Sequence, residues 1–544
     1  MNKYKILLIR TLFLIVVSIG VSGCMSTSSN IELPETKIWE TREMNRVSIH
    51  DPAASLVKTN DGENIYYVFG THLSQAKTKD FLTWNVPHYS PYENMEDNLL
   101  LGNTTETLKE TFEWAGHNDA DSTNGFNLWA PDVIWNEDFE WANGDKGAYL
   151  LFYSASSTWR RSAIALVASP AIEGPYTYVD TIIYSGFTSK DSTDGSMRNI
   201  HYGGTHLPEL IEEGTVSAFS EKWVRNGDRE YNTDYAPNAI DPAPFYDEDG
   251  NLMLAYGSWS GGIHILELNS KTGIPLYPGE DSVTEDGRTI DRYFGTKISG
   301  GYHQSGEGPY IVYDKESGYY YLYLTYGGLT AQGGYNMRLF RSENVYGPYI
   351  DQQNNTGIIE AGDINENYGI KISGNYNFSG LTSGGYRAPG HNSVVIDEDN
   401  NWFNVFHTRF DSGNEMHEVR VHQMIKNSSD WPIQLPYEYR GVLAETGQVS
   451  SEDIAGEYEF LNFGTANSTD MIEPSIIELK SEGTVTGEVS GEWTIDENGF
   501  VTLIIEGVNY NGIITEQPDE NDETRKVFSA YGDNNTMIWG IKTQ

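Results

Sequence analysis

The sequence predicts an all-β protein, in which a five-bladed β-propeller is followed by a smaller antiparallel β domain. The 544 residues include 55 glycines and 36 tyrosines, and helical periodicity is scarce, as is typical of short strands joined by turns. One strand pattern recurs about five times before residue 430, and short alternating strands replace it after Trp431 and Pro432. A chain of this length, 38% hydrophobic, is ample for more than one core.

The first 24 residues predict a secretory signal. Three basic residues precede an apolar run over residues 11–21, and small residues lead to Cys24. The run is short for a membrane span, and because Cys24 is the only cysteine the mature protein has no internal disulfide. The ending is similar to a bacterial lipobox, which implies that Cys24 is lipidated and that residues 25–37 form a flexible tether.

The repeated pattern before residue 430 is a buried strand, which in most copies follows a turn-forming cluster. The copies are 65–70, 148–154, 252–258, 319–324 and 402–407. Two copies are also followed by similar segments, residues 168–176 and 341–349, each ending in Gly-Pro-Tyr. Small sheets repeated at irregular spacing cannot bury themselves singly, and they predict a propeller over residues 38–437.

A second domain is expected over residues 438–544, because the repeats stop there. Its predicted strands are 456–460, 475–479, 485–489, 501–505 and 537–540. About a hundred residues of this kind suit a small antiparallel barrel or sandwich. No pair of acids stands in a persuasive context there, so we expect an accessory or packing role.

The charge of the chain limits its partners. A formal net charge of −43 argues against nucleic acid, because phosphate binding requires clustered Lys and Arg. It excludes no neutral ligand, such as a plain polysaccharide. The simplest interpretation of the charge is solubility in an extracellular setting.

Three acidic residues lie in tight turns that contain proline: Asp51 before Pro52, Asp241 before Pro242, and Glu307 two residues before Pro309. A proline favours extended geometry in the residue before it, so we expect Asp51 and Asp241 to project from stiff strand starts. Glycosidic bond cleavage requires such carboxylates, one as acid and one as base, with a third to tune their pKa values. The alternative is that Asp-Pro is a common turn dipeptide.

These three motifs, together with residues 128–133 before the second blade, follow the order found in glycoside hydrolase family 43. The chain resembles that family, most closely its endo-1,5-α-L-arabinanases, and its last part is similar to the C-terminal β domain of the larger extracellular members. The resemblance implies hydrolysis, with inversion, of internal α-1,5-L-arabinofuranosidic bonds of arabinan, a side chain of plant pectin.

The resemblance also implies roles for the acids. Asp51 would be the general base, Glu307 the general acid, and Asp241 the residue that raises the pKa of the acid and orients it. Inversion requires acid and base carboxyls roughly 6.5–9.5 Å apart, so that a water fits between base and anomeric carbon. Asp132 is the rival catalytic acid, and we expect it instead to cap the start of a strand.

Substrate contacts and a metal follow from the same resemblance. The expected substrate-binding residues are Asn238, Ala239, Ile240, Ser258, Trp259 and Trp129. The two tryptophans could stack on sugar faces or be core aromatics. His391, within Pro-Gly-His-Asn, resembles the family histidine that holds one Ca²⁺ ion in the propeller channel, with most coordination left to water because calcium prefers oxygen ligands. The acidic run 247–250 has its glycine in the wrong place for an EF-hand, and we expect a hairpin tip.

Two alternatives remain open at this stage. One is an exo-acting α-L-arabinofuranosidase or β-xylosidase of the same family, and the other is a surface propeller that binds glycan without cleaving it. Polar insertions around 89–124 and 188–235 are expected to frame the cleft. The sequence thus predicts a secreted monomer that acts on arabinan, anchored by lipid to the bacterial cell surface or outer membrane.

Overall fold

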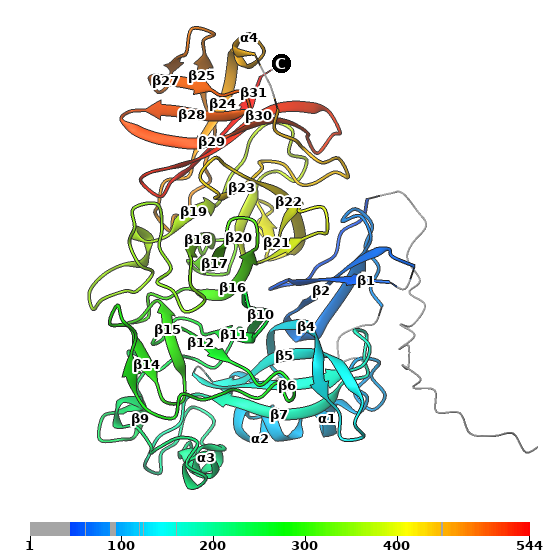
Figure 1. Cartoon of the computed structure of the whole chain (residues 1–544), viewed down its shortest axis with the longest axis vertical. Helices are drawn as coiled ribbons and strands as arrows, with labels where there is room; N and C mark the ends of the chain where they lie inside the picture. The colour runs from blue at the N-terminus through cyan, green and yellow to red at the C-terminus, as the bar shows by residue number, and fades with distance from the viewer. Residues whose placement is uncertain are drawn as a thin grey trace, which may run out of the picture.

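The structure, a computed structural model, describes residues 44–59, 61–87, 94–118, 120–122, 125–158, 160–447 and 450–543. It forms a ring of five antiparallel sheets, with a closed barrel beyond the fourth and fifth sheets (Figure 1). The predicted signal and tether, residues 1–24 and 25–37, lie outside the described residues. No helix in the described part of the chain has the length and apolar character needed to cross a membrane.

Each blade is a meander of antiparallel strands. Blade 1 contains β1 (Ala53–Lys58), β2 (Asn64–Gly70) and β3 (Ser74–Thr78), and blade 2 contains β4 (Leu128–Glu140), β5 (Lys146–Thr158), β6 (Arg161–Ser169) and β7 (Thr177–Tyr184). Blade 3 contains β10 (Ala243–Tyr246), β11 (Leu252–Tyr256), β12 (Ile263–Glu267), β15 (Gly295–Ser299), β14 (Thr289–Asp291) and β13 (Ser282–Val283). Blade 4 contains β16 (Glu307–Asp314), β17 (Tyr319–Tyr326), β18 (Asn336–Ser342) and β19 (Ile370–Ser373), and blade 5 contains β20 (Tyr386–Ile396), β21 (Trp402–Phe410), β22 (His417–Lys426) and β23 (Pro432–Gln434). The prediction of five blades is confirmed.

The first strand of each blade lines the centre of the ring. One residue from each of these strands borders the same central cavity: Ala53, Ala130, Ala243, Gly308 and Asn392. The five recurring patterns in the sequence fall on the second strands, which are buried along most of their length. Unbroken apolar runs mark these strands because each lies inside its sheet, between neighbouring blades.

The two similar segments 168–176 and 341–349 adopt the same local structure. The Tyr176 hydroxyl donates to the carbonyl of Ile172 at 2.9 Å, and the Tyr349 hydroxyl donates to the carbonyl of Val345 at 2.9 Å. Both segments carry a cis Gly-Pro peptide. The run at 247–250 forms the hairpin tip between β10 and β11, as predicted, and the Asp247 carboxylate accepts backbone N–H groups of that turn.

A left-handed residue precedes the proline of every first strand. The φ angles are 56° at Asp51, 37° at Ala130, 55° at Asp241, 59° at Gly308 and 48° at Ala388. The expectation that Asp51 and Asp241 are extended is therefore wrong. The strand register shifts at this point in blades 2, 4 and 5. Such bulges redirect side chains beside functional sites, although a non-glycine residue in this conformation costs about 1–2 kcal/mol.

The two insertions differ in their packing. The first carries α1 (Thr104–Thr107) and α2 (Lys109–Ala115), which pack on blade 2, where the Trp114 indole N–H donates to the carbonyl of Ser185 at 3.2 Å. The second carries α3 (Leu207–Glu212), β8 (Val224–Arg225) and β9 (Glu230–Tyr231), and it joins the core shared by blades 2 and 3. Four short 3₁₀ helices lie in these loops and beside blade 1: η1 (Thr71–Leu73), η2 (Ala120–Ser122), η3 (Tyr202–Gly204) and η4 (Glu221–Trp223).

The second domain is a closed eight-stranded barrel, so of the two predicted forms the barrel is the correct one. Its strands are β24 (Gly456–Asn462), β25 (Ser475–Leu479), β26 (Thr484–Gly487), β27 (Gly491–Ile495), β28 (Phe500–Ile505), β29 (Val508–Pro518), β30 (Thr524–Gly532) and β31 (Met537–Lys542). Helix α4 (Ser451–Ile454) precedes them, and η5 (Asn365–Asn367) lies in blade 4. The predicted boundary at 437/438 falls between β23 and β24.

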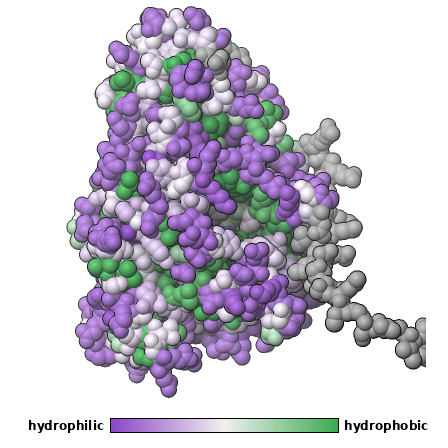
Figure 2. Space-filling view, viewed as in Figure 1, coloured by the Kyte–Doolittle hydropathy of each residue, from purple (hydrophilic) through white to green (hydrophobic). Residues whose placement is uncertain are grey.

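The barrel docks firmly on the propeller. The Trp539 ring of the barrel meets the Tyr376 ring of blade 4 edge to face, with 5.0 Å between centroids. The buried Lys371 ammonium donates to the carbonyls of Phe463 and Ala466 at 3.0 and 2.7 Å. Elsewhere, hydrophilic side chains cover most of the visible face (Figure 2), in keeping with the large negative charge.

Candidate active site

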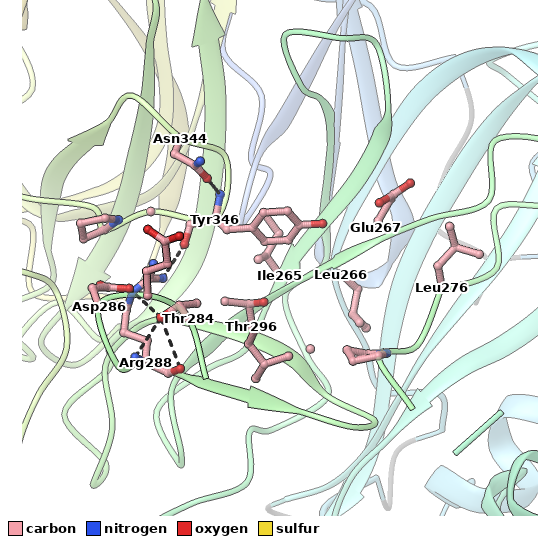
Figure 3. A pocket seen from close by; sticks show the side chains of 16 residues that line it. Ile265, Leu266, Glu267, Leu276, Thr284, Asp286, Arg288, Thr296, Asn344 and Tyr346 are labelled. Carbon is pink, nitrogen blue, oxygen red and sulfur yellow. Dashed lines mark hydrogen bonds and ion pairs between the residues drawn. The ribbon is translucent and has the colours of Figure 1, made fainter. Parts of the chain in front are cut away.

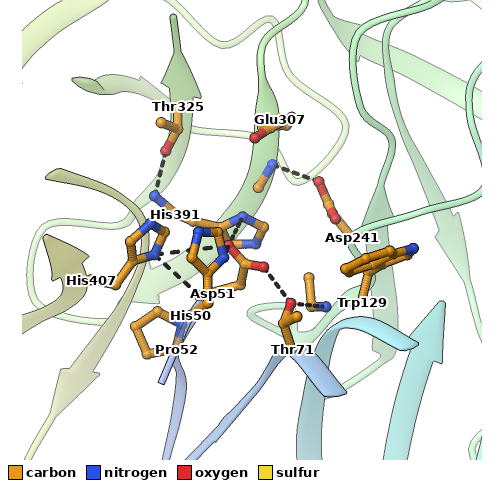
Figure 4. Close-up of polar contacts among 12 residues, drawn as sticks. His50, Asp51, Pro52, Thr71, Trp129, Asp241, Glu307, Thr325, His391 and His407 are labelled. Atoms are coloured by element: carbon orange, nitrogen blue, oxygen red, sulfur yellow. Dashed lines mark hydrogen bonds and ion pairs between the residues drawn. The ribbon is translucent and has the colours of Figure 1, made fainter. Parts of the chain in front are cut away.

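The fold brings the three predicted acids together at the centre of the ring (Figure 4). Asp51 and Asp241 directly precede the prolines that lead into β1 and β10, and Glu307 is the first residue of β16. The Gly308 N–H donates to Asp241 Oδ2 at 3.1 Å, which places Asp241 beside the peptide that follows Glu307. A cavity of about 20 Å³, enough for one water, lies against Asp51 and Asp241.

Histidines and one hydroxyl surround Asp51. Its Oδ1 lies 2.7 Å from His50 Nδ1 and 3.1 Å from His391 Nδ1, and its Oδ2 accepts the Thr71 hydroxyl. The backbone N–H of Asp51 donates to His407 Nδ1 at 3.1 Å, and the His50 and His407 rings stack with centroids 3.8 Å apart. These contacts hold both oxygens of the Asp51 carboxylate in place.

The same neighbours also set the charge of Asp51. Burial works against ionisation, but His391 and His50 outweigh it and hold the pKa of the Asp51 carboxyl well below its usual range. For His391 burial likewise opposes the charge, yet Asp51, Asp241 and Glu307 raise its pKa to about 9. Asp51 is therefore a carboxylate at neutral pH, the form in which a general base must act.

Neutral donors surround Glu307. Oε1 accepts the Tyr335 hydroxyl at 2.6 Å, and Oε2 accepts the Trp259 indole N–H at 2.8 Å and the Ser258 hydroxyl at 3.3 Å. Trp259 and Ser258 belong to the loop after β11, and Tyr335 is the residue just before β18. Two different blades therefore orient this carboxyl, which is half-buried, whereas Asp51 is buried.

Asp241 is a buried carboxyl that forms no ion pair within the described part of the chain. Burial raises its pKa to about 7, with Glu307 and Asp51 acting in the same direction and His391 and the Gly308 N–H acting against them. The side chain thus titrates near neutrality. Its position beside both other acids fits the predicted modulator.

We expected Asp132 to cap the start of a strand, and this expectation is wrong. Asp132 lies inside β4, just after the bulge, and lines the central cavity. Its Oδ1 accepts the N–H of Val133 at 2.7 Å, and burial raises its pKa well above the usual range. The carboxyl is therefore part of the cavity wall and keeps its proton to a higher pH than an ordinary aspartate does.

The remaining predicted binding residues form two groups. Trp129 is half-buried at the cleft, where its indole N–H donates to the Ser156 hydroxyl at 2.8 Å. Asn238 and Ala239 are buried, and both contact the Ser185 hydroxyl, while Ile240 is half-buried.

The metal prediction centres on His391, which borders the cavity together with Asn392. Asn392 Oδ1 is buried and has no hydrogen-bond partner within the described ranges. An orphaned amide oxygen and nearby carboxyls are the donors that calcium prefers. A different set, His50, Asp51 and His407, has ligand atoms within 4.8 Å of one another, but these atoms already bond to each other and to the backbone.

Sequence reasoning missed several side chains of the site. Tyr335 follows two glycines and carries no local signal, and Thr71 belongs to no acidic motif. On the side of Glu307, Arg160 Nη2 lies 3.0 Å from His303 Nδ1, and His303 Nε2 lies 2.9 Å from the Thr233 hydroxyl. Thr233 belongs to the second insertion, so its end, unlike the helices of the first, reaches the site.

Comparisons with known proteins identify relatives of both domains. The family model for glycosyl hydrolases family 43 matches residues 219–432, and the model for a C-terminal lipocalin-like domain that accompanies this family matches residues 436–540. An extracellular endo-α-(1→5)-L-arabinanase of Thermotoga petrophila is 36% identical over 510 residues, which cover 91% of this chain and 94% of the relative.

A second relative and a solved structure extend the similarity over both domains. The extracellular endo-α-(1→5)-L-arabinanase 2 of Bacillus subtilis is 35% identical over 525 residues, covering 94% of this chain and 96% of the relative. The crystal structure of an endo-1,5-α-L-arabinanase from Thermotoga petrophila RKU-1 superposes with a TM-score of 0.74 at 33% identity, covering 92% of this chain and 100% of that one.

Proposed function

The chain belongs to family 43 of the glycosyl hydrolases, and we propose that it cleaves internal α-1,5-L-arabinofuranosidic bonds of arabinan with inversion of configuration. The observation that carries the proposal is the meeting of an ionised, caged Asp51 with a half-buried Glu307 and a third acid, Asp241, beside the peptide that follows Glu307. Relatives similar over more than nine-tenths of this chain are endo-α-(1→5)-L-arabinanases, which favours the endo-acting reading over exo-acting or purely glycan-binding ones.

Asp51 is the base in this mechanism. It would take a proton from a water that attacks the anomeric carbon, while Thr71, His50 and His391 hold its two oxygens in place. Because its carboxylate is ionised well into the acidic range, the base is ready without a prior proton transfer.

Glu307 is the acid that donates a proton to the leaving oxygen. Tyr335, Trp259 and Ser258 orient its carboxyl toward the substrate side. Asp241 positions the same segment through the Gly308 N–H, and its negative charge, when present, favours the protonated form of a neighbouring acid.

Product analysis on linear 1,5-arabinan tests the proposal. Oligosaccharides of mixed length should appear within the first minutes, and NMR should show that the new reducing ends have the inverted anomeric configuration. Release of arabinose alone from the start would replace the endo assignment with an exo one, and retained configuration would reject the mechanism.

A calcium ion beside His391 is the second part of the proposal. Neutral His391, Asn392 Oδ1, nearby carboxylates and water would hold it, and binding would release the proton that His391 otherwise carries. The ion would add positive charge beside the acids and link blades. Removal by a chelator should lower the melting temperature together with activity, and calcium should restore both; a melting temperature unmoved by chelator and calcium would reject the site.

Secretion with a lipid anchor is the third part. Extracellular relatives support secretion, and the signal ending at Cys24 supports the anchor. We propose a monomer held at the cell surface by the several acyl chains that stable anchoring requires. In the producing bacterium, Cys24→Ser should abolish labelling by a radioactive fatty acid, and unchanged labelling would rule Cys24 out.

A further inference from the structure

A second hollow lies at the other end of the inner strands. Strand β16 starts at Glu307 and ends at Asp314, which puts its two ends about 23 Å apart. Around the far end, blades 2, 3 and 4 enclose a hollow of about 710 Å³, within the range of small-molecule sites. Tyr310 of β16 borders both this hollow and the central cavity, so the hollow extends from the middle of β16 to its far end, and none of the three acids lines it.

An exposed tryptophan forms one wall of this hollow. Trp135 of β4 is 40% exposed, although its strand is an inner one. Its ring meets the Tyr149 ring edge to face, with 4.8 Å between centroids. Gly147 makes room for the indole, because a Cβ at Gly147 would lie 2.8 Å from Trp135 Cζ2. The indole is thus held by its neighbours, and little conformational entropy is lost when a ligand stacks on it.

Two tyrosines from the neighbouring blades add to the aromatic lining, which also includes Phe245 and Tyr310. Tyr246, at the end of β10, donates its hydroxyl to the carbonyl of Trp135 at 2.8 Å and so ties blade 3 to blade 2. Tyr313, near the end of β16, packs on the Tyr320 ring with 4.7 Å between centroids. Three blades therefore present aromatic groups to one space.

The charges around the hollow select against anions. Glu137, Asp138, Asp247, Glu248 and Asp249 line it, with Lys315 as the cation among the lining residues. This excess of negative charge repels polyanions such as acidic pectin chains. Carboxylates accept hydrogen bonds from hydroxyl groups, and aromatic rings offer apolar faces, a combination that suits a neutral, hydroxyl-rich sugar chain.

We propose that this hollow, centred on Trp135, is a second binding site for neutral arabinan, remote from the bond-cleaving acids. The proposal rests on the proposed function, because arabinan is the neutral polymer that the active site would cut. A site of this kind keeps the enzyme on a long polymer between cleavage events and leaves short oligosaccharides unaffected, since these reach the active site alone.

Another hollow of similar size provides a control. It measures about 610 Å³, lies between blade 3 and the turn after β18, and contains Tyr346 (Figure 3). The cation in this hollow is Arg288, and it already bonds to protein groups: its Nε donates to Asp286 at 2.7 Å and its Nη1 donates to the carbonyl of Tyr346. Tyr346→Ala removes an aromatic ring from this hollow without touching the Trp135 site.

Affinity electrophoresis in gels containing linear arabinan measures binding directly. In a Glu307→Ala background, which prevents digestion, Trp135→Ala should weaken retardation, with an apparent Kd about tenfold higher. Tyr346→Ala should leave retardation unchanged, and gels with polygalacturonate should retard none of the proteins. Equal retardation with and without Trp135, or a loss caused by Tyr346→Ala alone, would overturn the assignment.

Kinetics of the otherwise wild-type enzyme separate this inference from the proposed function. Trp135→Ala should lower kcat/KM on long arabinan several-fold and leave kcat/KM on short arabino-oligosaccharides unchanged. Asp138→Asn, which spares the aromatic packing, should show the same split at smaller size. If the wild type cleaves arabinan but both variants act equally well on long and short substrates relative to wild type, the second binding site is rejected and the proposed function stands. If the wild type cleaves no arabinan, the proposed function itself fails.

Discussion

Asp51 and Glu307 both lie at the centre of the ring (Figure 4), and their surroundings differ in kind. Asp51 is buried among histidines, with His50 and His391 on one oxygen. Glu307 is half-buried and accepts hydrogen bonds from the neutral donors Tyr335, Trp259 and Ser258. Charged histidines hold the first carboxyl in its ionised form, whereas neutral donors orient the second.

The difference teaches how one fold separates an acid from a base. Both carboxyls lie at the start of an inner strand, so the repeated blade places them in equivalent positions. The residues around each carboxyl come from other parts of the ring and differ: blade 5 brings His391 and His407 to Asp51, and blades 3 and 4 bring Trp259 and Tyr335 to Glu307.

The largest expected effects come from removing either carboxyl. Asp51→Ala and Glu307→Ala should each lower kcat on linear arabinan by about 10³-fold or more, since each removes a proton-transfer group together with its positioning. Melting temperature provides the control for folding. A variant that folds yet keeps more than a tenth of wild-type kcat would remove that residue from the mechanism.

A smaller effect is expected at Asp241. Folding raises its pKa from 3.8 to about 7, so the folded state binds the extra proton and stability falls as pH rises from 3.8 towards 7. Asp241→Asn keeps the acceptor for the Gly308 N–H and removes this penalty, so the variant should gain melting temperature over wild type at pH 8 but not at pH 4.

Activity provides the second readout for Asp241. We expect Asp241→Asn to lose about 10²-fold in kcat, because the acid loses a neighbouring charge. A gain in melting temperature that is equal at pH 4 and pH 8 would show that the carboxyl does not titrate between them.

The smallest effect concerns the orientation of the acid. Tyr335→Phe removes the hydroxyl that lies 2.6 Å from Glu307 Oε1 and should lower kcat about tenfold, with KM little changed. Tyr326→Phe is a matched control from the same sheet, since the buried Tyr326 hydroxyl has no hydrogen-bond partner within the described ranges. Equal effects of the two changes would attribute the loss to packing.

Much of the propeller could be predicted because its signals are local. The second strands, such as 65–70 and 148–154, are apolar runs bounded by turns, and their burial follows from composition alone. In the barrel, β24 and β25 were predictable because apolar and polar residues alternate along them. Strand β29 (Val508–Pro518) was missed, because it mixes asparagines and a glycine with apolar residues and owes its place to partners on both sides.

The site was harder to predict where distant contacts decide the geometry. Asp51 and Asp241 lie just before β1 and β10 and adopt left-handed backbone conformations, whereas the proline that follows each of them favours extended geometry on its own. The contact of Tyr335 with Glu307 depends on how β17 and β18 are joined. Trp259, expected to stack on sugar, donates its indole N–H to Glu307, a role that residue type alone could not reveal.

Rescue by a good leaving group tests the separation of acid and base most directly. An arabino-oligosaccharide that carries an aryl group needing no protonation should restore much of the activity of Glu307→Ala, because the missing acid is then not required. The same substrate should leave Asp51→Ala inactive, since water still lacks its base. Equal rescue of both variants, or rescue of Asp51→Ala alone, would contradict the assignment of the two carboxyls.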